Sequence, residues 1–307
     1  MEPPIDIDPL DAALGALQPR GAFLFRGDFG APWGFATAPG PATFHIVEAG
    51  RCVIAAGGHT EAVEAGDLAV TPHGMAATFA DAPGRPTPAI EHLVGDVDPG
   101  RTVRLRAGGD GPRTALVCGG VAFDDAVAHP ILDALPPVFV VRGAMHDGTP
   151  WLANTLQFLA CESRSGRLGA STVMGHLGSI VFVQAIRAAL ADRPAAPGWL
   201  GALDDPYVGP ALRAIQTAPE RRWTVEALGR EVGLGRSAFA ARFRSAVGES
   251  PMQHLTRWRV HRAAQLLRGE APLVEVAAQV GYESEAAFGR AFKRWTGRSP
   301  GAVRRAA

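Results

Sequence analysis

The sequence is poor in cysteine and lacks long apolar segments. Its three cysteines, Cys52, Cys118 and Cys161, form no CxxC pair and cannot all join in disulfides, which favours a reducing compartment. Apolar runs stop well short of about 18 residues, so no transmembrane span is expected. The acidic opening residues, MEPPIDIDPLDAAL, lack the basic start of a signal peptide. These absences predict a cytoplasmic protein without a membrane segment.

Lysine is almost absent, since Lys293 is the only one, and arginine carries the remaining positive charge. The formal net charge of zero hides an asymmetry. Residues 210–307 hold 17 Arg or Lys against 8 Asp or Glu, whereas residues 1–209 hold 13 against 22. A coding bias explains the choice of arginine over lysine but not the one-sided shortage of acids. The asymmetry predicts a polyanion-binding module at the C-terminal end of a two-domain chain.

Hydrophobic patterning divides the chain into a strand-rich part and a helical part. Residues 20–123 read as short strands of an antiparallel sandwich or small barrel, broken by an irregular insertion at 81–100. Helical spacing of apolar residues follows at 150–164 and 170–191. The prolines of DRPAAPGW, residues 192–199, are typical of a linker. From Asp205 onward the pattern predicts helices joined by short turns.

A helix-turn-helix pattern occurs twice in this helical part. The first copy, residues 224–248, reads TVEALGREVGLGRSAFAARFRSAVG, and the second, residues 273–297, reads LVEVAAQVGYESEAAFGRAFKRWTG. First-helix apolar positions match at an offset of 48 and second-helix phenylalanines at an offset of 49, so the copies differ by one residue in the turn. Residues 250–268 have the spacing of one long connecting helix. Because an internal repeat is far more specific than one copy, the basic duplicate predicts DNA binding.

These motifs resemble a known family. Residues 206–305 are similar to the DNA-binding domain of AraC/XylS transcription regulators, through GRSAFAARFRSAVGESPMQHLTRWR and VAAQVGYESEAAFGRAFKRWTGRSPGAVRR. The N-terminal half resembles the cupin-type sensor domain of one AraC subgroup, through APWGF, FHIVEAG, EAGDLAVTPHG, LVCG and HPILDALPP. The resemblance implies an N-terminal all-β cupin-like sandwich or barrel followed by helices, and a C-terminal all-α domain with two helix-turn-helix units.

The resemblance also implies domain boundaries and partners. Residues 1–145 are expected to sense an effector, residues 146–200 to form a helical dimerisation or linker region, and residues 205–307 to bind DNA. The implied partners are double-stranded promoter DNA, a small-molecule effector, a second copy of the chain and, for an activator, RNA polymerase. The implied role is that of a transcription regulator and not of an enzyme.

Both second helices of the repeat are expected to enter the major groove. The family's base-contacting positions fall on Arg236, Ser237, Ala240 and Ala241 in the first copy and on Glu285, Ala286, Gly289 and Arg290 in the second. Arg290 suits guanine and Glu285 suits cytosine, although Glu285 equally fits a charge that stabilises a helix N-terminus. The phosphate contacts are expected from Arg242, Arg244, Lys293, Arg294 and Arg298. Since the first copy offers mainly methyl groups, either it reads thymine methyls and DNA shape or most base specificity rests on the second copy.

The cupin-like half lacks the usual metal ligands. The stretch GDLAVTPHGMAA places Ala77 where the second cupin motif has a histidine, and the first motif keeps only His45. No cofactor is therefore expected. A non-standard metal site of His45, His73 and Cys118, or redox sensing by Cys118 or Cys52, remains an alternative. A cupin enzyme with a helical tail would need the missing ligands. A DNA-repair methyl acceptor would need a more reactive cysteine setting than LVCGG.

An apolar pocket inside the sandwich is the simplest effector site. Its candidate residues are Trp33, Phe35, Phe44, His45 and Phe79. The helices at 150–164 and 170–191 resemble the family's dimerisation helices, the alternative being that they only cap the β domain.

Overall fold

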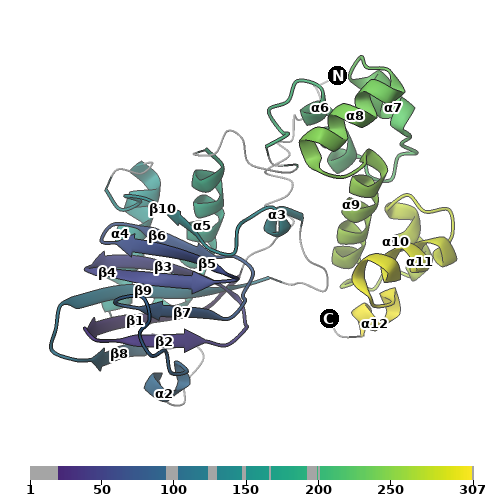
Figure 1. The fold of residues 1–307 in the computed structure, drawn as a ribbon. Helices are drawn as coiled ribbons and strands as arrows, with labels where there is room; N and C mark the ends of the chain where they lie inside the picture. The colour runs from purple at the N-terminus through teal and green to yellow at the C-terminus, as the bar shows by residue number, and fades with distance from the viewer. Residues whose placement is uncertain are drawn as a thin grey trace. The chain divides into compact units, whose positions relative to one another are not determined.

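The computed structural model describes residues 20–94, 103–123, 130–146, 150–165, 167–191, 199 and 201–305. They form two compact units, which are considered separately (Figure 1). The β unit contains the described residues of Pro19–Phe123 and Leu135–Asp192. The helical unit contains those of Arg193–Ala307 with the short segment 130–134, which includes α3 (Pro130–Asp133). Most of the predicted linker at 192–199 lies outside the described residues.

Two sheets make up the core of the β unit, which confirms the predicted sandwich. The six-stranded sheet has the order β10 (Phe139–Val141), β6 (Leu68–Thr71), β3 (Ala42–Ala49), β9 (Arg113–Ala122), β1 (Arg20–Gly30) and β8 (Val103–Gly108). The four-stranded sheet has the order β2 (Gly34–Thr37), β7 (Ala77–Ala80), β4 (Arg51–Ala56) and β5 (His59–Glu64). One feature differs from the predicted antiparallel arrangement, because β1 pairs with β8 in parallel.

Strand β3 shows how the sheet separates two apolar layers. Successive side chains of a strand point to opposite faces. Val47 belongs to the core between the sheets, and the neighbouring His45 lies 4.5 Å, ring centroid to ring centroid, from Phe79 of the other sheet. Phe44 points to the other face, since its ring fills the space where a Cβ on Gly119 would lie and comes within 3.3 Å of where a Cβ on Gly178 of α5 would lie. The fold therefore needs glycine at 119, which lets the Phe44 ring cover strand β9.

Two helices cover the outer face of the six-stranded sheet (Figure 1). They are α4 (Pro150–Ser165) and α5 (Ala170–Ala191), which confirms both predicted helices. They belong to the same compact unit as the strands, whereas the sequence predicted a separate region from residue 146. Among the described helices, only α5 is long and apolar enough to cross a membrane by length and composition. One third of that apolar stretch is buried, including Val181, Phe182, Ala185 and Ile186.

The predicted insertion at 81–100 contains α2 (Glu91–Val94) and a segment that runs beside β2. The amide of Ala36 donates to the carbonyl of Pro88 at 2.8 Å, and the amide of Ile90 donates to the carbonyl of Ala36 at 2.8 Å. Ile90 and Leu93 pack against the core between the sheets. We call residues 82–94 the flap; residues 95–100 lie outside the described part.

The helical unit contains the predicted repeat. The first copy is α7 (Val225–Glu231) and α8 (Arg236–Val247), preceded by α6 (Val208–Thr217); the second is α10 (Leu273–Gln279) and α11 (Glu285–Thr296), followed by α12 (Pro300–Arg304). The turns contain Gly233 and Gly281 with φ of 72° and 81°, which favour glycine. Thr224 accepts a hydrogen bond from the amide of Ala227, and Ser284 accepts one from the amide of Ala287, so these hydroxyls cap the N-termini of α7 and α11.

Helix α9 (Pro251–Leu266) connects the two copies and contributes to both hydrophobic cores. Its N-terminal half supplies buried residues near the first copy, where the ring of His254 packs 5.8 Å from that of Phe243. Its C-terminal half contributes Val260 and Ala263 to the core that contains Phe288 and Phe292 of the second copy. Because the two cores share one continuous helix, neither copy can rotate freely about the other.

Candidate nucleic-acid interface and ligand cavities

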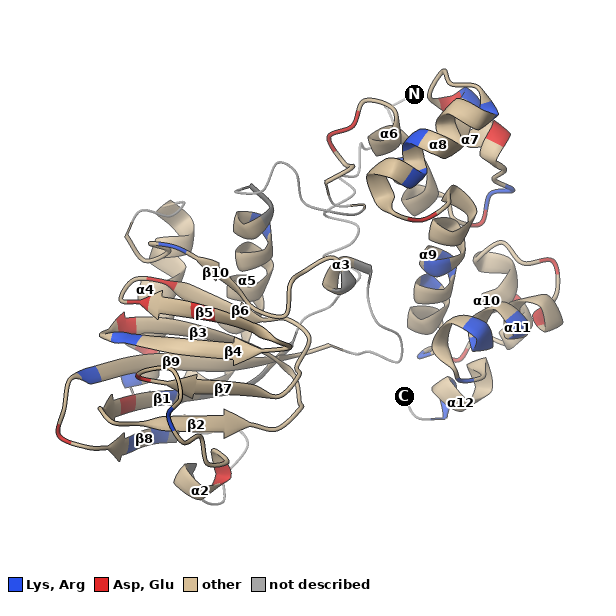
Figure 2. Ribbon diagram, viewed as in Figure 1, with Lys and Arg blue, Asp and Glu red and all other residues tan. Residues whose placement is uncertain are grey.

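Helix α11 is anchored by two aromatic side chains and leaves its other faces open. Phe288 and Phe292 are fully buried, with ring centroids 5.5 Å apart in an edge-on arrangement. The exposed side of the helix holds five of the residues predicted to contact DNA: Glu285, Ala286, Arg290, Lys293 and Arg294. Basic residues lie on α8, α9 and α11 (Figure 2). This helix thus combines a firm apolar anchor with a basic, accessible surface.

Gly289 lies in the middle of α11, where the protein itself does not require glycine. A Cβ at this position would meet no atom within 4 Å. A glycine within a helix costs about 1 kcal/mol of stability relative to alanine. The cost has no compensation within the fold, which is consistent with a surface that a partner approaches closely.

At the four positions predicted to contact bases, helix α8 has two polar residues and two alanines. Arg236, Ser237 and Ala241 are exposed and Ala240 is half-buried. Gly235 is the N-cap and makes no side-chain capping bond. The predicted pair of methyl groups is therefore accessible only in part, and Arg236 and Ser237 are the polar groups at the start of the helix.

Arg242 is engaged within the helical unit instead of being free for phosphate. Its Nε lies 3.1 and 3.0 Å from the two carboxylate oxygens of Asp205, and its Nη2 lies 2.9 Å from Oδ2. Its guanidinium also covers the ring of Tyr207 at 4.8 Å. Desolvation opposes the effect, but the hydrogen bond from Arg242 leaves the pKa of Asp205 below its usual range. Asp205 also accepts the amides of Tyr207 and Val208 at 2.9 Å, so the pair fixes the start of α6 against α8.

The five predicted effector residues are buried but do not line one pocket. Phe35 stacks on Phe79 at 4.8 Å and on Trp33 at 6.0 Å, and these rings fill the interior between the sheets. Phe44 lies on the opposite face of the sheet, against α5, so its inclusion with His45 was wrong for a reason of strand geometry. Among the described residues these side chains pack closely between the sheets, and the two cavities considered next lie at the edges of that core.

One cavity lies between the flap and the aromatic rings. Its volume is about 370 Å³. It is lined by Phe29, Pro32, Trp33, Gly34, Phe35, Arg85, Pro86, Leu93, Ala107 and Gly108. Arg85 is the one charged residue of this lining, and its guanidinium pairs with Asp81 through two hydrogen bonds of 2.9 Å. We call this space the flap cavity; it has the size and the mostly apolar lining of a small-molecule site.

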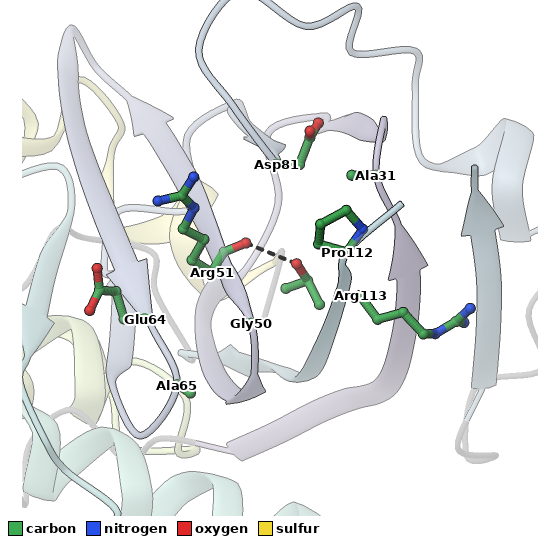
Figure 3. A pocket seen from close by; sticks show the side chains of 9 residues that line it. Ala31, Gly50, Arg51, Glu64, Ala65, Asp81, Pro112 and Arg113 are labelled. Atoms are coloured by element: carbon green, nitrogen blue, oxygen red, sulfur yellow. Dashed lines mark hydrogen bonds between the residues drawn. The ribbon is translucent and has the colours of Figure 1, made fainter. Parts of the chain in front are cut away.

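A second, polar cavity of about 540 Å³ lies at the ends of strands from both sheets (Figure 3). Arg51, Glu64, Asp81 and Arg113 line it. Two of these charges already have partners, because Asp81 pairs with Arg85 and Arg113 with Asp28 at 2.8 Å. Thr114 donates to the carbonyl of Arg51 at 2.9 Å across the floor. No sequence pattern predicts this cavity, since its residues come from five separate strand ends.

The three predicted metal ligands are not all brought together, because His73 lies apart from the other two. His73 is exposed and its Nε2 donates to the carbonyl of Leu135 at 2.9 Å, whereas His45 is buried beside Cys118 in the β3–β9 register. Burial lowers the pKa of His45 to about 3, so its ring is neutral, and Nε2 lies 2.8 Å from the hydroxyl of Thr43. Within the described ranges, no three His, Cys, Asp or Glu side chains are grouped so as to hold a metal ion. The predicted set of His45, His73 and Cys118 is therefore corrected.

The two interior cysteines are protected thiols. Burial raises the pKa of Cys52 to about 12 and the pKa of Cys118 well above its usual value. Since the thiolate is the species that oxidants attack, both thiols are poor redox sensors in the folded protein. Cys161 on α4 is exposed.

Comparisons with known proteins agree with this architecture. The chain matches the cupin family over residues 8–191 and a helix-turn-helix domain over residues 228–306. It is 32% identical over 307 residues to a putative AraC-like transcription regulator of Streptomyces antibioticus, a match that covers 97% of this chain and 99% of the relative. It is 38% identical over 180 residues to the HTH-type transcriptional regulator AlkR of Acinetobacter baylyi, covering 58% of this chain and 59% of AlkR.

Among solved structures, the DNA-binding domain of AdpA in complex with a target DNA is 35% identical, covers 34% of this chain and 93% of its own, and has a TM-score of 0.32. The family match over more than half of the chain and the full-length relative together define the class. The chain belongs to the AraC-like family of transcription regulators. It is a DNA-binding transcription regulator with a cupin-like N-terminal domain.

Thiol accessibility gives a direct check on the redox alternative. We expect a disulfide reagent such as dithionitrobenzoate to titrate one thiol per native chain, Cys161, and three after unfolding in guanidinium, because burial keeps Cys52 and Cys118 protonated. The Cys161→Ser variant should titrate none while folded. Rapid reaction of two or three thiols in the native protein would contradict the burial and reopen redox sensing.

Proposed function

We propose that the recognition helices α8 and α11 enter successive major-groove segments on one face of the operator, and that α11 supplies most of the base specificity. The observation that carries the proposal is the duplication itself, with two exposed basic helices mounted on one continuous helix, α9. Recognition helices held this way meet DNA about one helical turn, or about 34 Å, apart.

The exposed residues divide into two roles. Arg290 and Glu285 carry groups that pair with base edges, guanine O6 and N7 for the arginine and cytosine N4 for the carboxylate. Lys293 and Arg294 lie in the last turn of α11 and suit phosphates, which orient a protein on DNA without specifying a sequence. In α8, Arg236, Ser237 and Arg244 are the remaining polar candidates, because Arg242 is held by Asp205.

Two substitutions on α11 separate these roles. We expect Arg290→Ala to weaken binding to the preferred operator by about 10- to 100-fold and to relax the preference at one base pair, because a bidentate contact is lost. Lys293→Ala should weaken all sequences alike and reduce the salt slope of log K by about 1. Titrations of labelled operator, single-base variants and unrelated DNA at several salt concentrations measure both effects. Uniform weakening by Arg290→Ala would contradict its base-reading role.

We further propose that a small, flat and largely apolar effector occupies the flap cavity. Trp33 and Phe35 supply aromatic walls, and Arg85 offers the cavity a cationic group. The flap contacts edge strand β2 through two backbone hydrogen bonds at Ala36, so an occupant could shift it without disturbing the sheet. The interior between the sheets offers less room, because its rings are packed against one another.

A cavity-filling change tests this site. Ala107 is half-buried in the cavity wall, so we expect Ala107→Phe to fill the space and abolish the rise in melting temperature that small aromatic and aliphatic compounds produce with the wild type. Ala62→Phe, on the exposed side of β5, is the matched control and should retain the response. A compound that stabilises Ala107→Phe as strongly as the wild type would place the effector elsewhere.

Homodimerisation through α4 and α5 is the third part of the proposal. Each helix exposes two large apolar side chains seven residues apart: Trp151 (38%) and Phe158 (52%) on α4, and Val173 (38%) and Ile180 (46%) on α5. The seven-residue spacing places each pair on one helix face. Exposed apolar stripes on an otherwise soluble fold are typical of protein interfaces.

Charge placed on this surface tests the dimer. We expect the wild type to sediment as a dimer and Ile180→Glu to sediment as a monomer, because a symmetric interface would bury two unpaired carboxylates. Arg187→Glu, an exposed change on the same helix, should remain dimeric. A wild-type monomer at micromolar concentration, or a dimeric Ile180→Glu protein, would contradict this interface.

A further inference from the structure

The two helix-turn-helix units meet at a second place besides their shared helix. The segment before α7, residues 219–222, lies against the turn of the second unit, residues 281–283. A Cβ on Gly281 would lie 2.6 Å from the carbonyl oxygen of Glu220. Arg222 and Glu283 add a surface ion pair of 2.7 Å, which contributes little because both side chains are mostly exposed.

Arg259 lies at the centre of this contact. It projects from α9 next to Val260, where the helix changes from the first core to the second. Its Nε donates to the carbonyl of Pro219 at 2.7 Å, and its Nη2 donates to the carbonyl of Arg221 at 2.9 Å. The same guanidinium lies 5.6 Å from the ring centre of Tyr282, in the turn of the second unit. One half-buried side chain therefore contacts both units.

This arrangement limits motions that α9 alone would allow. Long helices bend, and a bend near residue 259 would alter the angle between α8 and α11. Two charge-assisted hydrogen bonds and a ring contact, made to one side of the helix axis, oppose both bending and rotation. Gly281 lets the backbones approach closely enough for the contact, since a Cβ there would also lie 2.6 Å from Arg259 Nη2.

The spacing between two binding boxes that the protein accepts depends on the angle between its recognition helices. Inserting one base pair between two binding boxes moves the second by roughly 3.4 Å and turns it by roughly 34° about the DNA axis. A protein with rigidly connected helices loses contacts after such an insertion, whereas a flexible one follows the displaced box.

We propose that Arg259 is a positioning residue that fixes the distance and rotation between α8 and α11, and thereby sets the spacing of the two boxes that the protein accepts. Arg259 itself contacts no base. The inference rests on the proposal that both helices read DNA.

The test compares spacing profiles of the full-length protein. A two-box site recovered by selection is rebuilt with one base pair removed, with native spacing, and with one or two base pairs added. We expect the wild type to lose about tenfold or more on a single insertion, as for loss of a base contact. Arg259→Ala should bind the native site about tenfold more weakly but lose about threefold or less on insertion. Base preferences within each box should stay unchanged.

Arg262→Ala is the matched control, because Arg262 is exposed on the same helix and donates to Gln265 of that helix at 3.3 Å. It removes the same charge and should keep the wild-type profile. Gly281→Ala is a second variant that retains Arg259 but forces the two segments apart, and it should flatten the profile too. It decides the question if Arg259→Ala fails to fold by circular dichroism.

An unchanged spacing profile in folded Arg259→Ala or Gly281→Ala would overturn the positioning role while leaving two-helix reading intact. A wild type that binds a single box as tightly as both boxes would contradict two-helix reading, and this inference with it.

Discussion

The sharing of helix α9 between two hydrophobic cores is the constraint on which the DNA-reading part of the protein depends. The helix buries His254, Leu255 and Trp258 near the first copy and Val260, Ala263 and Ala264 near the second. With 16 residues it spans about 24 Å, which brings two recognition helices to the scale of one turn of DNA. Each copy would be too small to maintain a fixed orientation by itself, and the common helix joins them in one body.

In the β unit, successive side chains along each strand point to opposite faces of the sheet, which separates the apolar residues into two layers. One layer lies between the sheets and is filled by the rings of Phe29, Trp33, Phe35 and Phe79. The other lies between the six-stranded sheet and α5 and includes Phe44. Because side chains fill the space between the sheets, the two cavities described above lie at its edges, one of them between the flap and the aromatic rings. The effector site proposed above therefore lies beside the flap and not at the centre of the sandwich.

Local patterns allowed much of this architecture to be predicted from the sequence. The repeat, the caps at Thr224 and Ser284 and the helices at 150–164 and 170–191 depend on residues close in the chain. The partners of Arg242 and Arg259 were not predictable, since Asp205 lies 37 residues from Arg242 and Pro219 lies 40 residues from Arg259. The same is true of the parallel pairing of β1 with β8 and of the flap cavity, which only the folded chain assembles. The assignment of Phe44 to the interior pocket was wrong because Phe44 and the adjacent His45 were placed on the same face of strand β3.

Dimethyl sulfate probing of guanine N7 on a bound operator tests the central claim most directly, because N7 lies in the major groove. Simultaneous reading by α8 and α11 predicts two clusters of protected guanines on one face of the duplex, about 10 base pairs apart. A single cluster of protection, or protection confined to adenine N3 in the minor groove, would contradict the account.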